Sequence, residues 1–294
     1  MKALSVLLLI AFIWVAFGHR VTAEPALAPD ARLRVMTFNI RYDNPNDGEN
    51  AWPLRKEMVA SMIRFHQADL VGVQEALRGQ IDVLAGLLPE YAWFGVGRDD
   101  GRDKGEFSAI FYRRDRFTRL DGQTFWLSET PEVVGSKSWD AAITRVVTWC
   151  KFRDLRTKKV FYHFNTHFDH RGVQAREQSA RLLRARIPQI ASRQQVILTG
   201  DFNCNESAAP YRVITAKDAP GGVLLSDTRY LSKFGHHGPT TTFNNFKTLA
   251  GASTIDYIFV GERIRVWQHG ALSDTFDGRF PSDHIPVLAE IELE

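Results

Sequence analysis

The sequence contains only two cysteines in 294 residues. Cys150 and Cys204 allow at most one disulfide bond, which excludes a small scaffold held together by several disulfides. A free pair and a bonded pair are both compatible with the sequence. The chain also lacks a marked charge excess, since 37 basic residues face 34 acidic ones. Such a chain provides no strong general field for polyanions, so nucleic-acid binding would depend on local basic groups.

Beyond the N-terminus, no apolar run is long enough to span a bilayer. The run from Ala3 to Phe17 has 15 residues, short of the roughly 20 that a spanning helix needs, and Val21-Thr22-Ala23 follows it. This pattern is typical of an export signal with a small-residue cleavage site. We therefore expect a signal peptide at 1–23, one domain at 24–294, and a secreted or periplasmic monomer without integral membrane association. The mature chain would keep 35 basic and 34 acidic residues.

Short β-rich runs recur through the rest of the chain. They predict strands at 33–40, 70–74, 107–112, 146–152, 160–165, 196–199, 255–260, 264–267 and 285–291. Helical periodicity predicts helices after Pro53, at 77–88 and at 173–186. On the last of these we expect four exposed arginines, Arg176, Arg181, Arg184 and Arg186. No repeat or composition break divides the chain, and this many strands favours one α/β domain of two packed sheets flanked by helices.

Most of these predicted strands carry a polar residue near one end. Five such residues close a strand and three open one: Asn39, Glu75, His167, Asp201 and Asn203, then Asp256, Asp283 and His284. Taken singly, each is better explained as turn chemistry or as a solvated side chain. If the last two strands run antiparallel to their neighbours, however, strand starts and strand ends meet at one edge of the sheets. All eight side chains would then converge.

The segment Gly-Asp-Phe-Asn at 200–203 gives the sharpest signal. Gly200 permits a tight turn, while Asp201 and Asn203 alternate onto one side and Phe202 faces away. Two oxygen donors on one side make half of a cation site. Carboxylates and amides, without a cysteine cluster or a close histidine pair, favour Mg²⁺, with Mn²⁺ possible, over zinc. The doublet at 236–237 is interpreted as loop surface, because adjacent histidines on an extended chain point apart.

In chain order, these segments resemble the endonuclease/exonuclease/phosphatase superfamily, which includes DNase I-like nucleases, sphingomyelinases and inositol-phosphate phosphatases. The matching blocks are FNI at 38–40, QE at 74–75, NTH at 165–167, GDFN at 200–203, IDYIFV at 255–260 and SDH at 282–284. One block is a weak signal, whereas six in order are specific. GENAWPLRK at 48–56 and SWDAAITRVVTW at 138–149 look like a secreted bacterial branch. The resemblance implies a four-layer α/β/β/α sandwich of two mixed β-sheets.

The resemblance also implies a metal site and a water-activating pair. Glu75 resembles the main metal-ligating carboxylate, with Asn39 and Asp283 near the same ion. Asp201 and Asn203 match the pair that orients the attacking water or holds a second ion. Asp201 is the favoured base for that water.

Two histidines complete the implied catalytic set. His284 resembles the histidine that contacts the scissile phosphate, with Asp256 as its orienting partner. His167 matches the second histidine, and Glu106 occupies the place of the glutamate on which that histidine leans. Beside a carboxylate, each histidine is expected to stay cationic to higher pH than free imidazole. Arg145 fits a phosphate clamp, because a guanidinium matches phosphate oxygens, but an ordinary salt bridge explains it equally well.

These residues predict a Mg²⁺-dependent hydrolase in which water attacks a phosphate ester in line with the leaving group. The substrate would be a phosphodiester or phosphomonoester of a small molecule, lipid headgroup or polyol. A secreted nuclease is the alternative, with a phosphate track from Arg98, Arg102, Lys104, Arg41 and Arg171, although the near-neutral charge disfavours it. A binding module that has kept the fold without catalysis is a third, weaker hypothesis, because none of the core residues is missing.

Overall fold

A computed structural model describes residues 31–218, 222–251 and 253–294. The predicted signal peptide at 1–23 lies outside the described residues, so it stays a prediction. No helix in the described part of the chain is both long and apolar enough to cross a membrane. Cys150 and Cys204 are both buried and free.

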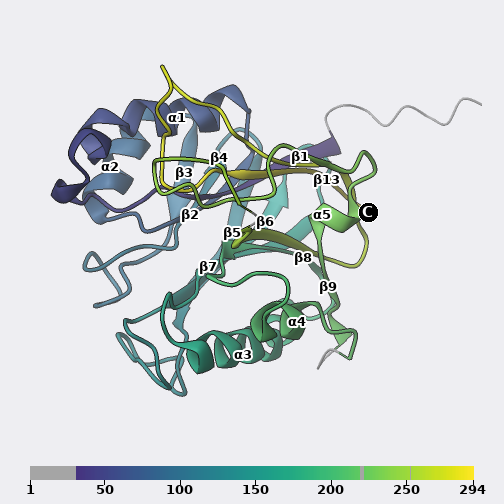
Figure 1. The fold of residues 1–294 in the computed structure, drawn as a ribbon. Helices are drawn as coiled ribbons and strands as arrows, with labels where there is room; N and C mark the ends of the chain where they lie inside the picture. Colours follow the sequence, from purple (N-terminus) through teal and green to yellow (C-terminus); the bar gives the residue numbers. More distant parts are fainter. Residues whose placement is uncertain (1–30, 219–221, 252) are drawn as a thin grey trace, which may run out of the picture.

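Two mixed β-sheets form the centre of the molecule (Figure 1). The seven-stranded sheet has the order β10-β12-β13-β1-β2-β4-β3, with β1 Arg32–Asn39, β2 Leu70–Gln74, β3 Tyr91–Phe94, β4 Ile110–Arg113, β10 His236–His237, β12 Ile264–Ala271 and β13 Val287–Leu293. The six-stranded sheet has the order β5-β6-β7-β8-β11-β9, with β5 Phe117–Trp126, β6 Val146–Asp154, β7 Val160–His167, β8 Gln195–Asp201, β9 Leu225–Asp227 and β11 Asp256–Gly261. Neighbouring strands are parallel at β1–β2, β7–β8 and β10–β12 and antiparallel elsewhere.

Helices cover the outer face of each sheet. The helices are α1 Lys56–Phe65, α2 Arg78–Leu87, α3 Val173–Ala191, α4 Ala209–Thr215 and α5 Thr228–Leu231, with short 3-10 turns at Pro45–Asn50 and Trp52–Leu54. In Figure 1, α1 and α2 lie over the seven-stranded sheet, and α3 and α4 lie on the opposite side of the molecule, over the six-stranded sheet. These layers form the four-layer α/β/β/α sandwich that the family resemblance implies, so the fold class is confirmed.

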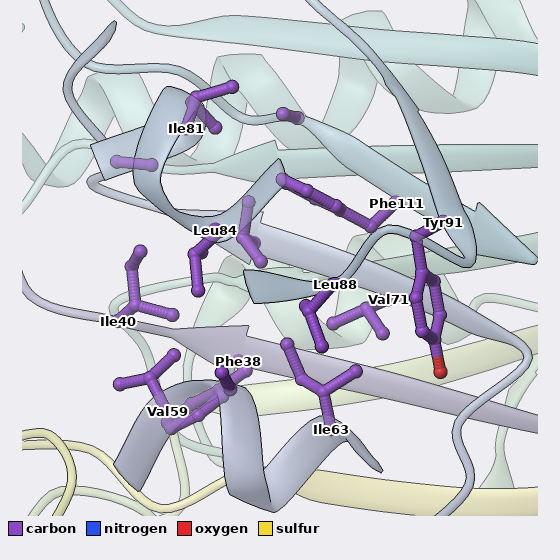
Figure 2. Close-up of a cluster of buried hydrophobic side chains, with 14 of the residues drawn as sticks. Phe38, Ile40, Val59, Ile63, Val71, Ile81, Leu84, Leu88, Tyr91 and Phe111 are labelled. Carbon is purple, nitrogen blue, oxygen red and sulfur yellow. The ribbon is translucent and has the colours of Figure 1, made fainter. Parts of the chain in front are cut away.

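Strand alternation divides the core into an outer part on each sheet and a part between the sheets. On β1, Leu33 and Val35 join the cluster between the sheets, whereas Met36 and Phe38 join the cluster under α1 and α2. Figure 2 shows this outer cluster, with Phe38 packed near Val59 of α1. Such burial of apolar area on both faces of each sheet is the main favourable contribution to folding.

The two sheets approach each other closely at Gly72 of β2. A Cβ atom built on Gly72 would lie only 2.2 Å from Thr199 Oγ1 and 2.4 Å from Asn165 Oδ1. Gly72 therefore admits these two polar side chains of the opposite sheet. Asn165 Nδ2 donates to the Val73 and Ala109 carbonyls at 2.9 and 3.0 Å. This contact fixes the sheets relative to each other directly beneath the strand ends.

The structure confirms the topology that convergence requires. β11 runs antiparallel to β8, which places Asp256 opposite Asp201. β13 runs antiparallel to β1, so the segment before β13 returns to the end of β1 at Asn39. The predicted strand at 285–291 begins only at Val287, two residues later than expected.

Several sequence predictions are wrong. Arg184 was expected on an exposed face of α3, but it is buried and donates to the Ile214 and Ala216 carbonyls at 2.8 and 2.9 Å. His236 is not simply loop surface, because β10 pairs with β12 and His236 Nδ1 lies 3.0 Å from His269 Nδ1. The predicted strand at 107–112 begins at Ile110, and β3, β5 and β9 were not predicted.

Candidate active site

A cavity of about 590 Å³ opens at the edge where β1, β2, β7 and β8 end and β11 begins. Eight predicted site residues line it, namely Glu75, Glu106, Arg145, His167, Asp201, Asn203, Asp283 and His284. Asn39 and Asp256 do not line the cavity, but both are hydrogen-bonded to residues that do. The convergence expected from the sequence is therefore observed, with residues 39–284 of the chain contributing to one pocket.

Asn39 joins the two sheets at the floor of this pocket. Its amide Nδ2 donates to Glu75 Oε1 and to Asp201 Oδ2, both at 3.0 Å. Its Oδ1 accepts from the Arg41 amide at 3.0 Å. The two carboxylates belong to different sheets, so Asn39 fixes their separation. An asparagine at this position thus does more than close a strand.

His284 forms a charged pair with Asp256. The imidazole Nδ1 donates to Asp256 Oδ2 at 2.9 Å, which directs Nε2 toward Asp201 Oδ2 at 3.8 Å. Burial opposes a charge on this ring, but the negative charges of Asp256 and Asp201 outweigh burial and raise the pKa of His284 well above its usual value. Asp256 takes the orienting place expected for it, and His284 is cationic at neutral pH.

His167 behaves differently from the expectation. Its Nε2 accepts from Asn203 Nδ2 at 3.0 Å and lies 3.4 Å from Asp201 Oδ2. Burial lowers the pKa of His167 well below the usual value, and the charges of Arg145 and Arg98 lower it further. The prediction that both histidines stay cationic is therefore wrong for His167. Its ring is neutral because burial disfavours a charge there and the positive charges of Arg145 and Arg98 add to this effect.

Glu106 does not hydrogen-bond to His167 as the resemblance implied. Glu106 Oε2 lies 4.0 Å from His167 Nδ1, and it instead accepts from Arg98 Nη1 at 2.6 Å. Burial raises the pKa of Glu106, and Arg98 opposes this effect. Glu106 thus stands beside His167 but is neutralised by an arginine. Arg98 is consequently unavailable for the phosphate track proposed for a nuclease.

Carboxylates accumulate around a space suited to a hard cation. Donor atoms of Glu75, His167 and Asp201 lie within 4.8 Å of one another, and those of Asp201, Asp256 and His284 form a second such group. Burial and the charge of Asp256 raise the pKa of Asp201 to about 7. Crowded acids with few neutralising partners are typical of a cation site, and His167 joins the candidate ligands.

A guanidinium lies over the remaining acidic residues. Arg41 binds Asp47 through Nε and Nη2, both at 3.0 Å, and its Nε and Nη1 lie 3.8 Å from Asp283 and 4.0 Å from Glu75. Burial raises the pKa of Asp283, the cation of His284 opposes this effect, and the charge of Glu75 adds to it. Arg41 therefore provides partial neutralisation at this end of the pocket. Sequence reasoning placed it only on the nuclease track, and it missed Asp47.

Arg145 is buried at the wall of the pocket, directly before β6. Its Nε lies 3.7 Å from Asp169 Oδ2, and its Nη2 lies 3.1 Å from His170 Nδ1. Its Nε and Nη1 find no hydrogen-bond partner among the described residues. The ion pair confirms the plainer of the two explanations considered. The Nε and Nη1 groups of Arg145 remain without acceptors, so the second explanation, a clamp that binds an anion, stays open.

Arg55 is the structural residue that sequence reasoning missed most completely. It is fully buried, and its guanidinium donates to the backbone carbonyls of Asn50, Ile40, Arg41, Tyr42 and Pro281. Burial lowers its pKa to about 10, which leaves it cationic at neutral pH. Arg55 ties the loop after β1 to the segment before Asp283. The only sequence signal was its place in the GENAWPLRK block.

Three site residues adopt left-handed backbone conformations that glycine favours. The φ angles of Arg41, Glu75 and Asn203 are 56°, 64° and 48°. Each such non-glycine residue costs about 1 kcal/mol or more, and such residues cluster at functional sites. In these conformations all three residues line the pocket.

Comparisons with known proteins agree with this geometry. Residues 36–284 match the Endonuclease/Exonuclease/phosphatase family, and the chain belongs to this family. A family protein of known structure from Bacteroides vulgatus is 41% identical, with a TM-score of 0.85, over 90% of this chain and 99% of that one. A mannosyl-6-phosphatase from Bacteroides thetaiotaomicron is 38% identical, with a TM-score of 0.83, over 88% and 99% of the two chains.

More distant relatives extend the comparison. An uncharacterized protein of Acanthamoeba polyphaga mimivirus is 26% identical over 162 residues, which cover 53% of this chain and 60% of that protein. The human nocturnin catalytic domain has a TM-score of 0.70 at 20% identity, which indicates a shared fold. Members of the family are hydrolases that include phosphatases and phosphodiesterases.

Proposed function

We propose that the protein is an exported, divalent-metal-dependent hydrolase of small phosphate esters, with sugar phosphates as substrates. The observation that carries this proposal is one pocket lined by the carboxylates of Glu75, Glu106, Asp201 and Asp283, the cationic His284 and the buried Arg145. The sugar-phosphate part is supported by the 38% identity to a mannosyl-6-phosphatase over nearly the full length of both chains. The monomeric state expected from the sequence is part of the same proposal.

The donor set of the pocket fits Mg²⁺ or Mn²⁺. Glu75, Asp283 and the Oδ1 atom of Asn39 would hold the ion, with Asp201 and Asn203 beside it. The fit rests on the acids of this pocket, where Arg41 lies 4.0 Å from Glu75 and 3.8 Å from Asp283. When bound, the ion supplies positive charge that stabilises the phosphoryl oxygens during attack.

The protein's own groups position the reactants. Asp201 Oδ2 would accept a proton from the attacking water, and Asn203 would orient that water. The Nε2 proton of His284 is available to a phosphoryl oxygen because Asp256 keeps the ring charged. Arg145 would bind a further phosphoryl oxygen through its Nε and Nη1 groups, which have no acceptor among the described residues. These fixed groups lower the barrier by placing charge where it develops in the transition state.

A substrate screen with a matched pair of variants tests the proposal. We expect the purified mature protein with Mg²⁺ to hydrolyse sugar phosphates and p-nitrophenyl phosphate, whereas phospholipid and duplex DNA are poor substrates. Asp256→Asn should reduce kcat by about 100-fold, because His284 loses its charged partner, and the melting temperature should change little. His237→Ala, at an exposed histidine of β10 outside the pocket, is the control. Hydrolysis of DNA alone would favour the nuclease, and no hydrolysis of any ester would refute the proposal.

Export is tested separately from catalysis. The apolar run at 3–17 followed by small residues at 21–23 supports cleavage after Ala23. N-terminal sequencing of protein recovered from the periplasm or medium of an expressing bacterium should begin at Glu24. Protein that retains residues 1–23 in the cytoplasm would contradict export.

A further inference from the structure

Arg145 and His170 form one wall of the pocket, and their contact determines which ring nitrogen of His170 can donate a hydrogen bond. Arg145 can only donate hydrogen bonds, so its contact of 3.1 Å to His170 requires His170 Nδ1 to accept. Nδ1 then carries no proton, and the ring proton of neutral His170 is on Nε2. His170 is exposed at the mouth of the cavity that it lines, which leaves this Nε2–H donor open to a ligand.

Both residues are held in place by a buried carboxylate. Asp169 accepts from the backbone amides of Ala142, Ile143, Arg171 and Gly172 at 2.7 to 3.3 Å. It thereby joins the loop that leads to Arg145 to the loop that carries His170. Its Oδ2 also lies 3.7 Å from Arg145 Nε. The orientation of the Arg145 guanidinium is thus set before a ligand arrives.

The Arg145 guanidinium retains two donors for which no described residue provides an acceptor. Arg145 has 4% of its surface exposed, and its Nε and Nη1 are buried without hydrogen-bond partners among the described residues. A buried unpaired donor costs about 1–3 kcal/mol, and more for a charged group. A phosphoryl oxygen at this wall would relieve that cost, and it would also accept from His170 Nε2.

We propose that Arg145 and His170 together bind the third non-bridging oxygen of the substrate, so that the enzyme selects phosphomonoesters over phosphodiesters. This inference rests on the proposed function. A monoester has three non-bridging oxygens and about two negative charges, whereas a diester has two such oxygens and one charge. In a diester, an uncharged alkoxy group would face the wall and leave the Nε and Nη1 donors of Arg145 without an anionic partner.

The reaction balances as a hydrolysis. The water oxygen forms a bond to phosphorus, the bond from phosphorus to the alkoxy oxygen breaks, the alcohol takes up a proton, and inorganic phosphate leaves. Inorganic phosphate carries the same oxygens as the monoester, so the wall should bind the product as well. His170 is a specificity-determining residue in this scheme, because its contact exists only for a group with a third free oxygen.

The test compares two esters with one leaving group. In the full protein with Mg²⁺, kcat/KM for p-nitrophenyl phosphate should exceed that for methyl p-nitrophenyl phosphate by about tenfold or more. His170→Ala should lower the monoester value by about 10- to 100-fold, as expected for loss of one charge-assisted hydrogen bond. The diester value should change by less than about threefold. His170→Gln, which keeps an amide donor, should restore part of the monoester activity, and His237→Ala should match the wild type.

Three results would overturn the inference: a wild-type preference for the diester, equal losses on both esters in His170→Ala, or no loss on either. Calorimetric titration with inorganic phosphate distinguishes failure of this inference from failure of the proposed function. If the wild type hydrolyses neither ester but binds phosphate at least tenfold more tightly than His170→Ala, the wall binds phosphate as inferred and the hydrolase proposal fails. Equal phosphate affinity in both proteins would overturn the inference itself.

Discussion

At the scale of single residues, the environment sets the charge of each histidine in the site. His284 faces the carboxylates of Asp256 and Asp201, which raise its pKa, whereas His167 is enclosed near Arg145 and Arg98, and its pKa falls. The His284 ring is therefore a cation, whereas the His167 ring is neutral and accepts a hydrogen bond from the side-chain amide of Asn203. Residue type alone makes the two histidines equivalent, and their neighbours in space make them different.

Replacement of Glu75 by glutamine tests the metal-binding role directly. The variant keeps the shape of the side chain and its bond from Asn39, but it removes one charge from the acidic cluster. We expect hydrolysis to fall by about 100-fold and Mn²⁺ affinity, measured by calorimetry, to fall in parallel. The free energy of unfolding without metal should stay unchanged or rise, because repulsion among the carboxylates decreases.

The control for this variant is Glu57→Gln, at an exposed position of α1. It should leave both activity and Mn²⁺ affinity as in the wild type. Glu75→Gln protein with wild-type activity and undiminished Mn²⁺ affinity would remove Glu75 from the site. Loss of activity together with a lower melting temperature would instead indicate a structural role.

The sequence predicts which residues gather at the site but not how each is neutralised. Asn39, Glu75 and Asp201 follow from polar residues at strand ends, a pattern that is local along the chain. Arg55 and His170 do not follow from it, because their partners are backbone carbonyls and an arginine that only the folded chain brings near. The prediction that His167 is cationic was wrong for the same reason, because the arginines near it are also brought there only by folding.

At the scale of elements, strands with regular burial were predictable and exposed ones were not. β2 is buried at every position, and its predicted bounds are those observed. β5 lies at the edge of its sheet and is buried only at its ends. Its sequence is largely polar, so no strand was predicted there. α3 continues past the predicted end at 186 and through Pro188 to Ala191. Periodicity identifies an element through its buried face and gives its end less accurately.

A buried arginine fixes α3 against α4, and its replacement measures that contact. Arg184 donates to the Ile214 and Ala216 carbonyls, near the C-terminal end of α4, where helix carbonyls lack partners within the helix. Arg184→Ala should lower the free energy of unfolding by about 2 kcal/mol or more, since two carbonyls lose a charged donor. Urea denaturation provides the measurement.

The same helix offers a matched control. Arg181 is exposed and, among the residues that the structure describes, pairs only with Glu177, one helical turn away, at 2.7 Å. Arg181→Ala should change stability by about 0.5 kcal/mol or less, because an exposed ion pair contributes little. Equal effects of the two substitutions would show that burial of Arg184 does not stabilise the contact between α3 and α4.

At the scale of the whole molecule, a polar layer between the two sheets sets their relative position. Gln74 of β2 donates to Asn165 Oδ1 of β7 at 2.7 Å, and Thr199 of β8 donates to the same oxygen at 3.0 Å. His163 Nε2 lies 2.8 Å from Thr199 Oγ1, and because that hydroxyl donates to Asn165, it accepts from His163. The layer lies under the strand ends, so it also sets the distance between site residues of different sheets.

This layer makes the stability of the protein sensitive to acid. His163 is fully buried, and burial lowers its pKa to about 3. Between about pH 6.5, the unfolded value, and pH 3, the unfolded chain binds a proton at this histidine and the folded chain does not. Stability is therefore fully present above the unfolded pKa and is lost as pH falls through this window. At pH 5 the loss from His163 alone should be about 2 kcal/mol relative to pH 8.

His163→Gln isolates this contribution, because glutamine keeps an amide donor for Thr199 and does not titrate. Urea unfolding of both proteins without metal, at pH 8 and pH 5, should show a free-energy loss about 2 kcal/mol smaller in the variant, while other titrating groups affect both alike. The variant starts from a lower stability at pH 8, since its side chain packs less well than the ring. Parallel losses in the two proteins would mean that His163 accepts a proton inside the folded core, and the polar layer would then tolerate a charge.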